Sequence, residues 1–306
     1  MSEETKFVDF TEVLDERDAV VASAFIYRQE MGLKTVSSNF CSSSQIDAYY
    51  REGRLLTREL LVMRFLYEMG EMTLSQIQMA FSHPSIDSDI LKISLSGSNP
   101  YQSDVQKLER LDMLRVMRLT VRGKDTLKIY GLSKSAAAWF KENFGNSGYL
   151  FDKNPEYAFK LPCETALTEL SHLAAVTAHI KFVTSSLDVL EYYSPVLIEG
   201  ANVYKGAYKF QTGESILTFP VRDASLEGDS VRRALSSSYL DASKAFIVLL
   251  VPSERTMFDL RELIKPDPSY SDDKVMYLSD LSAKDATNFP YVYRCNDSGF
   301  SVLSLF

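Results

Sequence analysis

The sequence predicts an α+β protein with two domains: a small domain of helices and a β-hairpin, then a mixed α/β sandwich, with an N-terminal helical arm before both. Two observations support this prediction. Helical periodicity followed by strand-like alternation around a glycine occurs between residues 99 and 132. Beyond residue 163, apolar strand-like segments alternate with helical ones. The length of 306 residues agrees with two domains of roughly 150 residues each.

The composition is that of a chain with enough apolar side chains for real cores. Apolar residues make up 45% and charged residues 24%, which are usual values for globular proteins. The longest apolar run, residues 245–251, is far shorter than the roughly 18 residues of a membrane-spanning helix. The start Met-Ser-Glu-Glu lacks the apolar segment of a secretory signal. We therefore expect a cytoplasmic protein with no membrane partner.

Neither the cysteines nor the histidines suggest a metal site, and we predict no metal and no cofactor. Cys41, Cys163 and Cys295 are far apart and form no CxxC pair. His172 and His179 are seven residues apart on one predicted helix, which is about 10.5 Å along its axis and too far to chelate one ion without other ligands. We expect both histidines at the edge of the core or on the surface. Phosphate-loop, GxSxG and HExxH motifs do not occur.

Positive charge is concentrated in one part of the chain. The formal net charge is −8, yet residues 54–145 carry 13 basic and 10 acidic side chains and are net positive. Residues 1–53 carry 5 basic and 10 acidic side chains, and residues 146–306 carry 15 and 21. A segment that neutralises nucleic-acid phosphates needs a basic balance of this kind.

Residues 100–111 are predicted to form a helix with one polar face. Asn99 can cap this helix and Pro100 suits its first position. Val105, Leu108 and Leu111 form one apolar stripe that should be buried. The remaining surface carries side chains that hydrogen-bond base edges or phosphates. The candidates for DNA contact on this helix are Tyr101, Gln102, Ser103, Gln106, Lys107 and Arg110.

A β-hairpin is predicted directly after this helix. Residues 115–121 and 126–130 are β-prone, and Gly123 in the segment 122–125 between them allows a tight turn. Helices predicted over residues 57–69 and 73–81 precede the polar helix, and one over 133–144 follows the hairpin. This order predicts a winged helix-turn-helix, the alternative being a helix and hairpin of an unrelated α+β domain. The candidates for DNA contact on the hairpin are Arg122, Lys124 and Lys128.

Glycines, prolines and serines suggest the domain boundaries. We expect four segments: an arm over residues 1–53, a winged helix over 54–145, a linker over 146–162 and an α/β domain over 163–306. Within the arm we expect a helix over 11–31 and a serine-rich loop over 37–44. A short strand near 91–95 is an option. In the last domain the pattern predicts helices over 165–187, 230–240 and 255–264 and strands over 189–199, 203–210, 215–221, 245–251 and 275–278.

A winged helix followed by a mixed α/β domain resembles the replication-relaxation family of plasmid-borne proteins. The resemblance rests on Leu108-Glu109-Arg110-Leu111, on Tyr130-Gly131-Leu132-Ser133 and on a later helix that bears His172. It implies a second domain with a degenerate core like that of restriction endonucleases. An active nuclease of that fold needs a carboxylate at one strand end and an acidic-x-Lys pair on the next strand. Residues 216–222 contain no carboxylate, and we expect Asp272-Asp273-Lys274 to form a solvated turn.

We therefore expect a non-catalytic protein that binds double-stranded DNA in a sequence-specific way. Its setting would be plasmid transfer, plasmid replication or transcriptional regulation. A single winged helix of small positive charge makes few phosphate contacts, so we also expect a homo-oligomer, with other DNA-processing proteins as candidate partners. Two alternatives stay open: a metal-dependent nuclease with a divergent site, and a winged helix that binds proteins.

Overall fold

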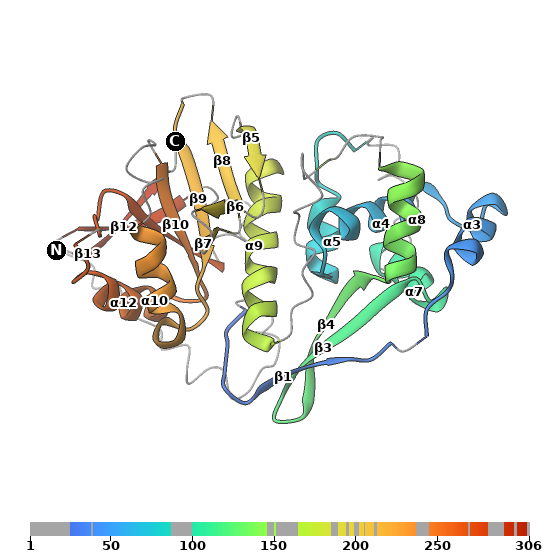
Figure 1. The fold of residues 1–306 in the computed structure, drawn as a ribbon, viewed down its shortest axis with the longest axis horizontal. Helices are drawn as coiled ribbons and strands as arrows, with labels where there is room; N and C mark the ends of the chain where they lie inside the picture. The colour runs from blue at the N-terminus through green and yellow to red at the C-terminus, as the bar shows by residue number, and fades with distance from the viewer. Residues whose placement is uncertain are drawn as a thin grey trace.

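The computed structural model is a mixed α and β structure in which helix α9 lies between two halves (Figure 1). Eight helices and two larger sheets are found over the residues that it describes. These residues are 25–37, 39–86, 100–145, 150, 165–184, 189–193, 196–198, 202–204, 206–210, 213–236, 245–268, 270–280, 291–296 and 299–304.

The first half contains an antiparallel sheet of four strands in the order β1-β3-β4-β2. Its centre is the hairpin of β3 (Leu114–Val121) and β4 (Lys124–Leu132). The edge strands are short: β1 (Met31–Thr35) pairs with β3, and β2 (Met72–Thr73) pairs with β4. The helix predicted over 11–31 is not helical from residue 25 onward, and its earlier part lies outside the described residues.

Three of the five described helices of the first half begin at a side-chain cap. Ser42 and Thr73 form capping boxes, and Ser133 caps a third helix through its hydroxyl. The predicted helices over 57–69, 73–81, 100–111 and 133–144 are confirmed to within two residues. Helix α3 was not predicted. The segment 91–95, where a short strand was an option, lies outside the described residues. The five helices are α3 (Ser43–Arg51), α4 (Thr57–Met69), α5 (Leu74–Ala80), α7 (Pro100–Arg110) and α8 (Lys134–Phe144).

The second half is built on a seven-stranded sheet in the order β13-β12-β11-β10-β9-β8-β5. The three central strands β9, β10 and β11 run parallel, and the pairs outside them are antiparallel. A separate ribbon joins β6 (Val196–Ile198) to β7 (Asn202–Tyr204). The strands of the large sheet are β5 (Val189–Tyr193), β8 (Gly206–Phe210), β9 (Ser215–Pro220), β10 (Ala245–Val251), β11 (Val275–Ser279), β12 (Tyr291–Asn296) and β13 (Gly299–Ser304).

Helices cover both faces of this sheet (Figure 1). Helix α9 (Ala166–Thr184) packs on one face, and α10 (Ala224–Leu235) and α12 (Glu254–Ile264) pack on the other. Strand β10 is apolar on both faces because both are covered. The helix predicted over 230–240 begins earlier, at residue 224, because the Asp223 carboxylate caps it. Strands β12 and β13 were not predicted.

Helix α9 packs against the large sheet on one side and against the first half of the molecule on the other. Leu170 and Leu173 pack against the hairpin and against Phe25, which is 1% exposed. The expectation of peripheral histidines is wrong, since His172 and His179 are 2% and 1% exposed. Their rings lie 3.0 Å from the Glu71 carbonyl oxygen and 2.8 Å from the Tyr208 hydroxyl, so they satisfy buried polar groups. Among the described helices none is long and apolar enough to cross a bilayer.

Candidate nucleic-acid interface

The inner face of α7 fixes this helix to the helices beneath it. Val105 and Leu108 are 1% and 0% exposed in the core of the first half. The Arg58 Nε of α4 donates to the Asp104 carboxylate of α7 over 2.9 Å, in a largely buried ion pair. Burial raises the pKa of Asp104 above its ordinary value, and the arginine only partly offsets this effect. Apolar packing and this largely buried ion pair therefore help to hold α7 in place.

The outer face of α7 presents polar side chains to solvent. Gln102, Ser103, Gln106 and Arg110 are all exposed, as the helical periodicity predicts. The Arg110 Nε donates to the Gln106 carbonyl oxygen over 3.2 Å, so the guanidinium lies along the helix surface. These four side chains form one continuous polar face, which has the hydrogen-bonding groups needed to contact base edges.

The two other candidates on α7 lie at the border of this face. The Tyr101 ring is half-buried and lies 4.5 Å from the Phe81 ring, centre to centre. The Lys107 Nζ lies 2.6 Å from a Glu59 carboxylate oxygen. The tyrosine therefore contributes packing between helices, and the charge of Lys107 is largely compensated.

The hairpin ends in a two-residue turn, shorter than the predicted turn of four residues. Val121 pairs directly with Lys124, and Arg122 and Gly123 have φ angles of 49° and 80°. Two successive positive φ values are typical of a type I′ turn, which matches the twist of a hairpin. Arg122 and Lys124 are exposed at the tip. Lys128 lies further back, with its Nζ 2.7 Å from a Glu109 oxygen of α7, so it joins the hairpin to that helix instead of extending the tip.

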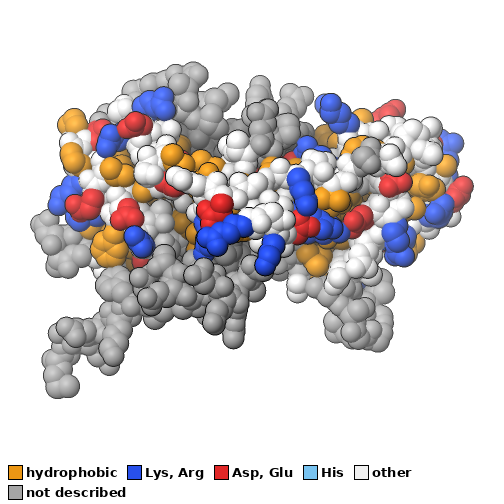
Figure 2. All heavy atoms as spheres, turned by 90° about the horizontal axis from the view of Figure 1, so that it is seen from below, with side chains coloured by type: hydrophobic (Ala, Val, Ile, Leu, Met, Phe, Trp, Pro, Cys, Tyr) orange, Lys and Arg blue, Asp and Glu red, His pale blue; other side chains and the backbone are white. Residues whose placement is uncertain are grey.

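Acidic side chains accompany most of the cations around the hairpin. Asp125 lies 2.8 Å from the Lys34 Nζ of β1 and also pairs with Arg118. These two hydrogen-bonded cations lower the pKa of Asp125 below its ordinary value. Arg122 lies 3.7 Å from Glu30. The hairpin tip points to the underside of the molecule in Figure 1, and on that face Figure 2 shows Lys and Arg interleaved with Asp and Glu.

An open depression of about 350 Å³ lies at the end of α7. Its lining residues are Arg54, Lys107, Arg110 and Leu111. Arg54 comes from the turn between α3 and α4, and no periodicity or motif in the sequence pointed to it. The depression therefore joins two predicted candidates to a third cation that only the fold brings close.

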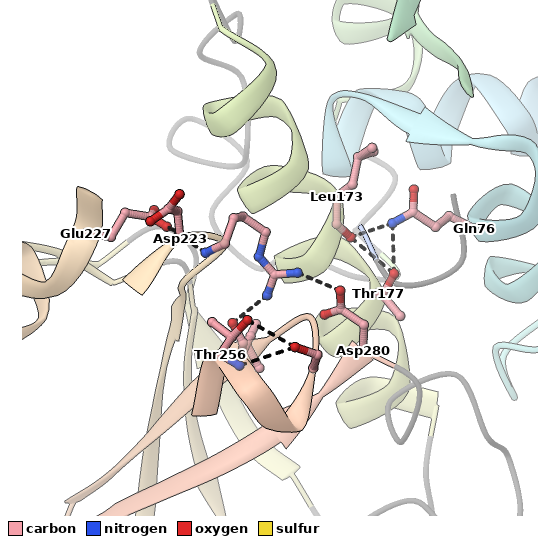
Figure 3. A network of polar contacts seen from close by, with 10 residues as sticks. Gln76, Leu173, Thr177, Asp223, Glu227, Thr256 and Asp280 are labelled. Atoms are coloured by element: carbon pink, nitrogen blue, oxygen red, sulfur yellow. Dashed lines mark hydrogen bonds and ion pairs between the residues drawn. The ribbon is translucent and has the colours of Figure 1, made fainter. Parts of the chain in front are cut away.

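A second polar cluster lies at the carboxyl ends of the parallel strands (Figure 3). The fully buried Arg222 guanidinium pairs with Asp280 over 2.6 Å and donates to the Leu250 carbonyl oxygen. Glu227 accepts hydrogen bonds from the backbone N–H groups of Arg222 and Asp223, and burial raises its pKa. These contacts join the ends of β9, β10 and β11: Arg222 pairs with Asp280 and Glu227 is held by backbone N–H groups, which is a structural role.

The sequence segments considered for a nuclease site do not converge on a set of carboxylates. Asp272, Asp273 and Lys274 lie in a turn before β11, as predicted. Over the described part of the chain, no group of three or more His, Cys, Asp or Glu side chains is placed to hold a metal ion.

The resemblance to the replication-relaxation family rests on the sequence segments quoted above. No protein-family model matches the chain, and no curated protein matches it either.

Proposed function

We propose that this chain is a non-catalytic protein that binds double-stranded DNA through a winged helix-turn-helix. The observation that carries the proposal is the exposed polar face of α7 together with the exposed cations of the hairpin tip, on a hairpin that Lys128 joins to α7. The order α4, β2, α5, α7 and hairpin, with β2 paired to β4, is consistent with a winged helix. In this arrangement α7 lies in the major groove and the hairpin follows the adjacent backbone.

The chemistry of the exposed side chains fits separate roles in recognition. The glutamines 102 and 106 can pair with both edge groups of an adenine, and Arg110 can do the same with a guanine. Arg122 and Lys124 at the tip suit phosphate contacts, which add affinity with little sequence preference. Lys124 and Arg110 have no ion pair with the other described residues, so their charge is available to DNA.

The small number of available cations supports a homo-oligomer that binds paired half-sites in the cytoplasm. Two copies on adjacent half-sites would add their contacts and raise both affinity and specificity. The α/β half would then serve self-association or contacts with other DNA-processing proteins, in plasmid transfer, plasmid replication or transcriptional regulation. Sedimentation with and without duplex should detect a species larger than one chain. A single-chain species at micromolar concentration in both states would remove the oligomer from the proposal.

The ion pairs around α7 favour one alternative, a winged helix that binds another protein. Lys107, Lys128 and Arg118 each have a carboxylate partner within the same half of the molecule. Such compensation reduces attraction to a polyanion. Binding that is insensitive to salt and to DNA sequence would favour this alternative.

The deciding experiment selects bound duplexes from random DNA and then measures affinity across a salt series. Gln106→Ala and Arg110→Ala should each weaken the selected site by about 1 to 3 kcal/mol, or roughly 5- to 150-fold, and relax one base position. The double variant Arg122→Ala, Lys124→Ala should weaken all duplexes alike. Its slope of log K against log salt should fall by about 0.9 for each lost phosphate contact.

Two exposed cations elsewhere supply matched controls. Lys141 lies on α8 and Arg255 on α12, and alanine at either position should leave affinity and slope unchanged. If α7 and hairpin variants bind like these controls, the proposed function is wrong.

A further inference from the structure

We propose that the depression lined by Arg54, Lys107 and Arg110 is an oxyanion site that holds one backbone phosphate of the nucleic acid on α7. The inference rests on the proposed function and deepens it, because it names the group bound and adds a residue that belongs neither to α7 nor to the hairpin. A phosphate held here would fix the position of α7 along the groove.

Arg54 is held in place by the turn that carries it. Gly53 has a φ of 69°, which ends α3 in the left-handed conformation that glycine adopts easily. The Arg54 N–H donates to the Tyr49 carbonyl oxygen over 2.9 Å, and its guanidinium lies 4.2 Å from the centre of the Tyr49 ring. Stacking of this kind orients a guanidinium and leaves its N–H groups able to donate to an anion.

Lys107 is fixed by a carboxylate that is itself fixed. Glu59 accepts the Lys107 ammonium over 2.6 Å through one oxygen and the Leu56 N–H over 2.9 Å through the other. The ammonium is therefore positioned at the wall of the depression, although the Glu59 carboxylate compensates its charge. An ammonium has three N–H donors, so it can still donate to a second acceptor.

The charge balance of the depression is positive. Its three cations face two nearby carboxylates, Glu59 on Lys107 and Glu52, whose oxygen lies 3.8 Å from the Arg54 Nη1. Arg110 pairs with no carboxylate among the described residues, and its Nε donates to the Gln106 carbonyl oxygen. An uncompensated guanidinium that shares a depression with two oriented cations favours binding of an anion.

The cations could instead only offset the helix dipole. Lys107 and Arg110 lie in the last turn of α7, where positive side chains interact favourably with the carbonyl end of a helix. Arg54 does not belong to this helix, and the dipole does not explain its position. The volume of about 350 Å³ is far above the roughly 10 to 15 Å³ that one water molecule needs by the same measure, so there is room for a phosphate group.

The test compares Arg54→Ala with Arg51→Ala in duplex binding across a salt series. Arg51 is an exposed arginine on α3, paired with Asp47 over 2.7 Å, and it does not line the depression. We expect the slope of log K against log salt to fall by about 0.9 for Arg54→Ala and to stay at the wild-type value for Arg51→Ala. Arg54→Lys should restore most of the slope. Thermal unfolding shows whether each variant is folded.

A second arm uses inorganic phosphate and follows the arginine Nε–H signals of ¹⁵N-labelled protein by NMR. Saturable shifts of the Arg54 and Arg110 signals, without a shift of Arg51, are expected. If wild type binds duplex but Arg54→Ala keeps the full slope, the phosphate site is wrong and the proposed function stands. If wild type binds no duplex, the proposed function is wrong. Phosphate-induced NMR shifts would in that case support a site for free phosphate. If phosphate causes no shifts either, the phosphate site is also wrong.

Discussion

Helices α7 and α9 show two opposite ways to place polar residues. On α7 most polar side chains lie on one face, in contact with water, and the apolar ones lie on the other with Asp104, which pairs with Arg58. On α9, 14 of the 19 side chains are buried, because the large sheet packs on one side and the first half of the molecule on the other. A polar face on α7 is therefore available to a ligand, whereas each polar group on α9 needs a partner inside the protein.

Two glutamines make this difference concrete. Gln106 on α7 is exposed, whereas Gln76 on α5 is fully buried against α9. The Gln76 amide donates to the Leu173 carbonyl oxygen over 2.6 Å and to the Thr177 hydroxyl over 2.9 Å (Figure 3). One side-chain type thus serves recognition at one position and the contact between the two halves at another.

The largest effect is expected where α9 is buried most deeply. Leu173→Ala should lower the free energy of unfolding by about 2 to 5 kcal/mol, because this side chain of α9 is fully buried against the hairpin and Phe25. Leu226→Ala is the matched control, since Leu226 on α10 is 53% exposed and its loss should change stability little. Urea denaturation measures both. Equal losses for the two variants would mean that α9 is not the shared core element described above.

An intermediate effect is expected for the two glutamines: loss of Gln76 should lower stability, and loss of Gln106 should lower affinity for DNA. Gln76→Ala should cost about 1 to 3 kcal/mol of stability, because the Leu173 carbonyl and the Thr73 N–H lose buried hydrogen-bond partners. Gln106→Ala should change stability by less than about 0.5 kcal/mol and affect only binding to DNA. Urea denaturation gives the free energy of unfolding of both variants, and duplex binding gives their affinity for DNA. The comparison fails if Gln106→Ala is the more destabilising change.

The smallest effect concerns two aspartates that both pair with arginines. The pKa of Asp104 is raised by burial, and that of exposed Asp125 is lowered by Lys34 and Arg118. Asp125 therefore contributes stability above its unfolded-state pKa, and this contribution is lost as pH falls through its lower folded-state pKa. Asp104 has the opposite sign: the folded state takes up its proton first, so its contribution becomes more favourable as pH falls.

A carboxyl NMR titration checks both directions against the ordinary value of about 3.9. Added salt should move the pKa of Asp125 back toward that value and leave Asp104 nearly unchanged, because exposed charges are screened more than buried ones. Lys34→Ala should also raise the pKa of Asp125. Shifts in the same direction for the two aspartates would contradict the assigned burial.

Local signals in the sequence were sufficient for the elements that such signals specify. Gly70 ends α4, and Thr73 and Ser133 cap the helices after them, so these boundaries could be predicted. The exposed face of α7 followed from its own periodicity. The domain boundaries at residues 53 and 163 remain predictions.

Other features depend on residues far apart in the chain. β1 is identified by its pairing with β3, where Met31 lies opposite Val121, and α3 buries only Ile46, so neither element has a strong pattern of its own. The ion pair of Arg222 with Asp280 and the approach of Arg54 to α7 also need the complete fold. Sequence reasoning could list Lys107 and Arg110 but not the depression that they share with Arg54.

The short strands at the edges of the first sheet limit how a partner can approach it. An open strand edge invites another chain to continue the sheet through main-chain hydrogen bonds, which is a common route to aggregation. β1 covers the eight-residue strand β3 with only five residues, one of them Lys34, and β2 offers two residues before α5 begins. β1 therefore covers most of one edge of the hairpin, whereas β2 pairs with only Ile129 and Tyr130 of the nine-residue strand β4 on the other edge. Among the described residues, strand addition to this sheet is therefore restricted to the β4 side of the hairpin, and β1 blocks it on the β3 side.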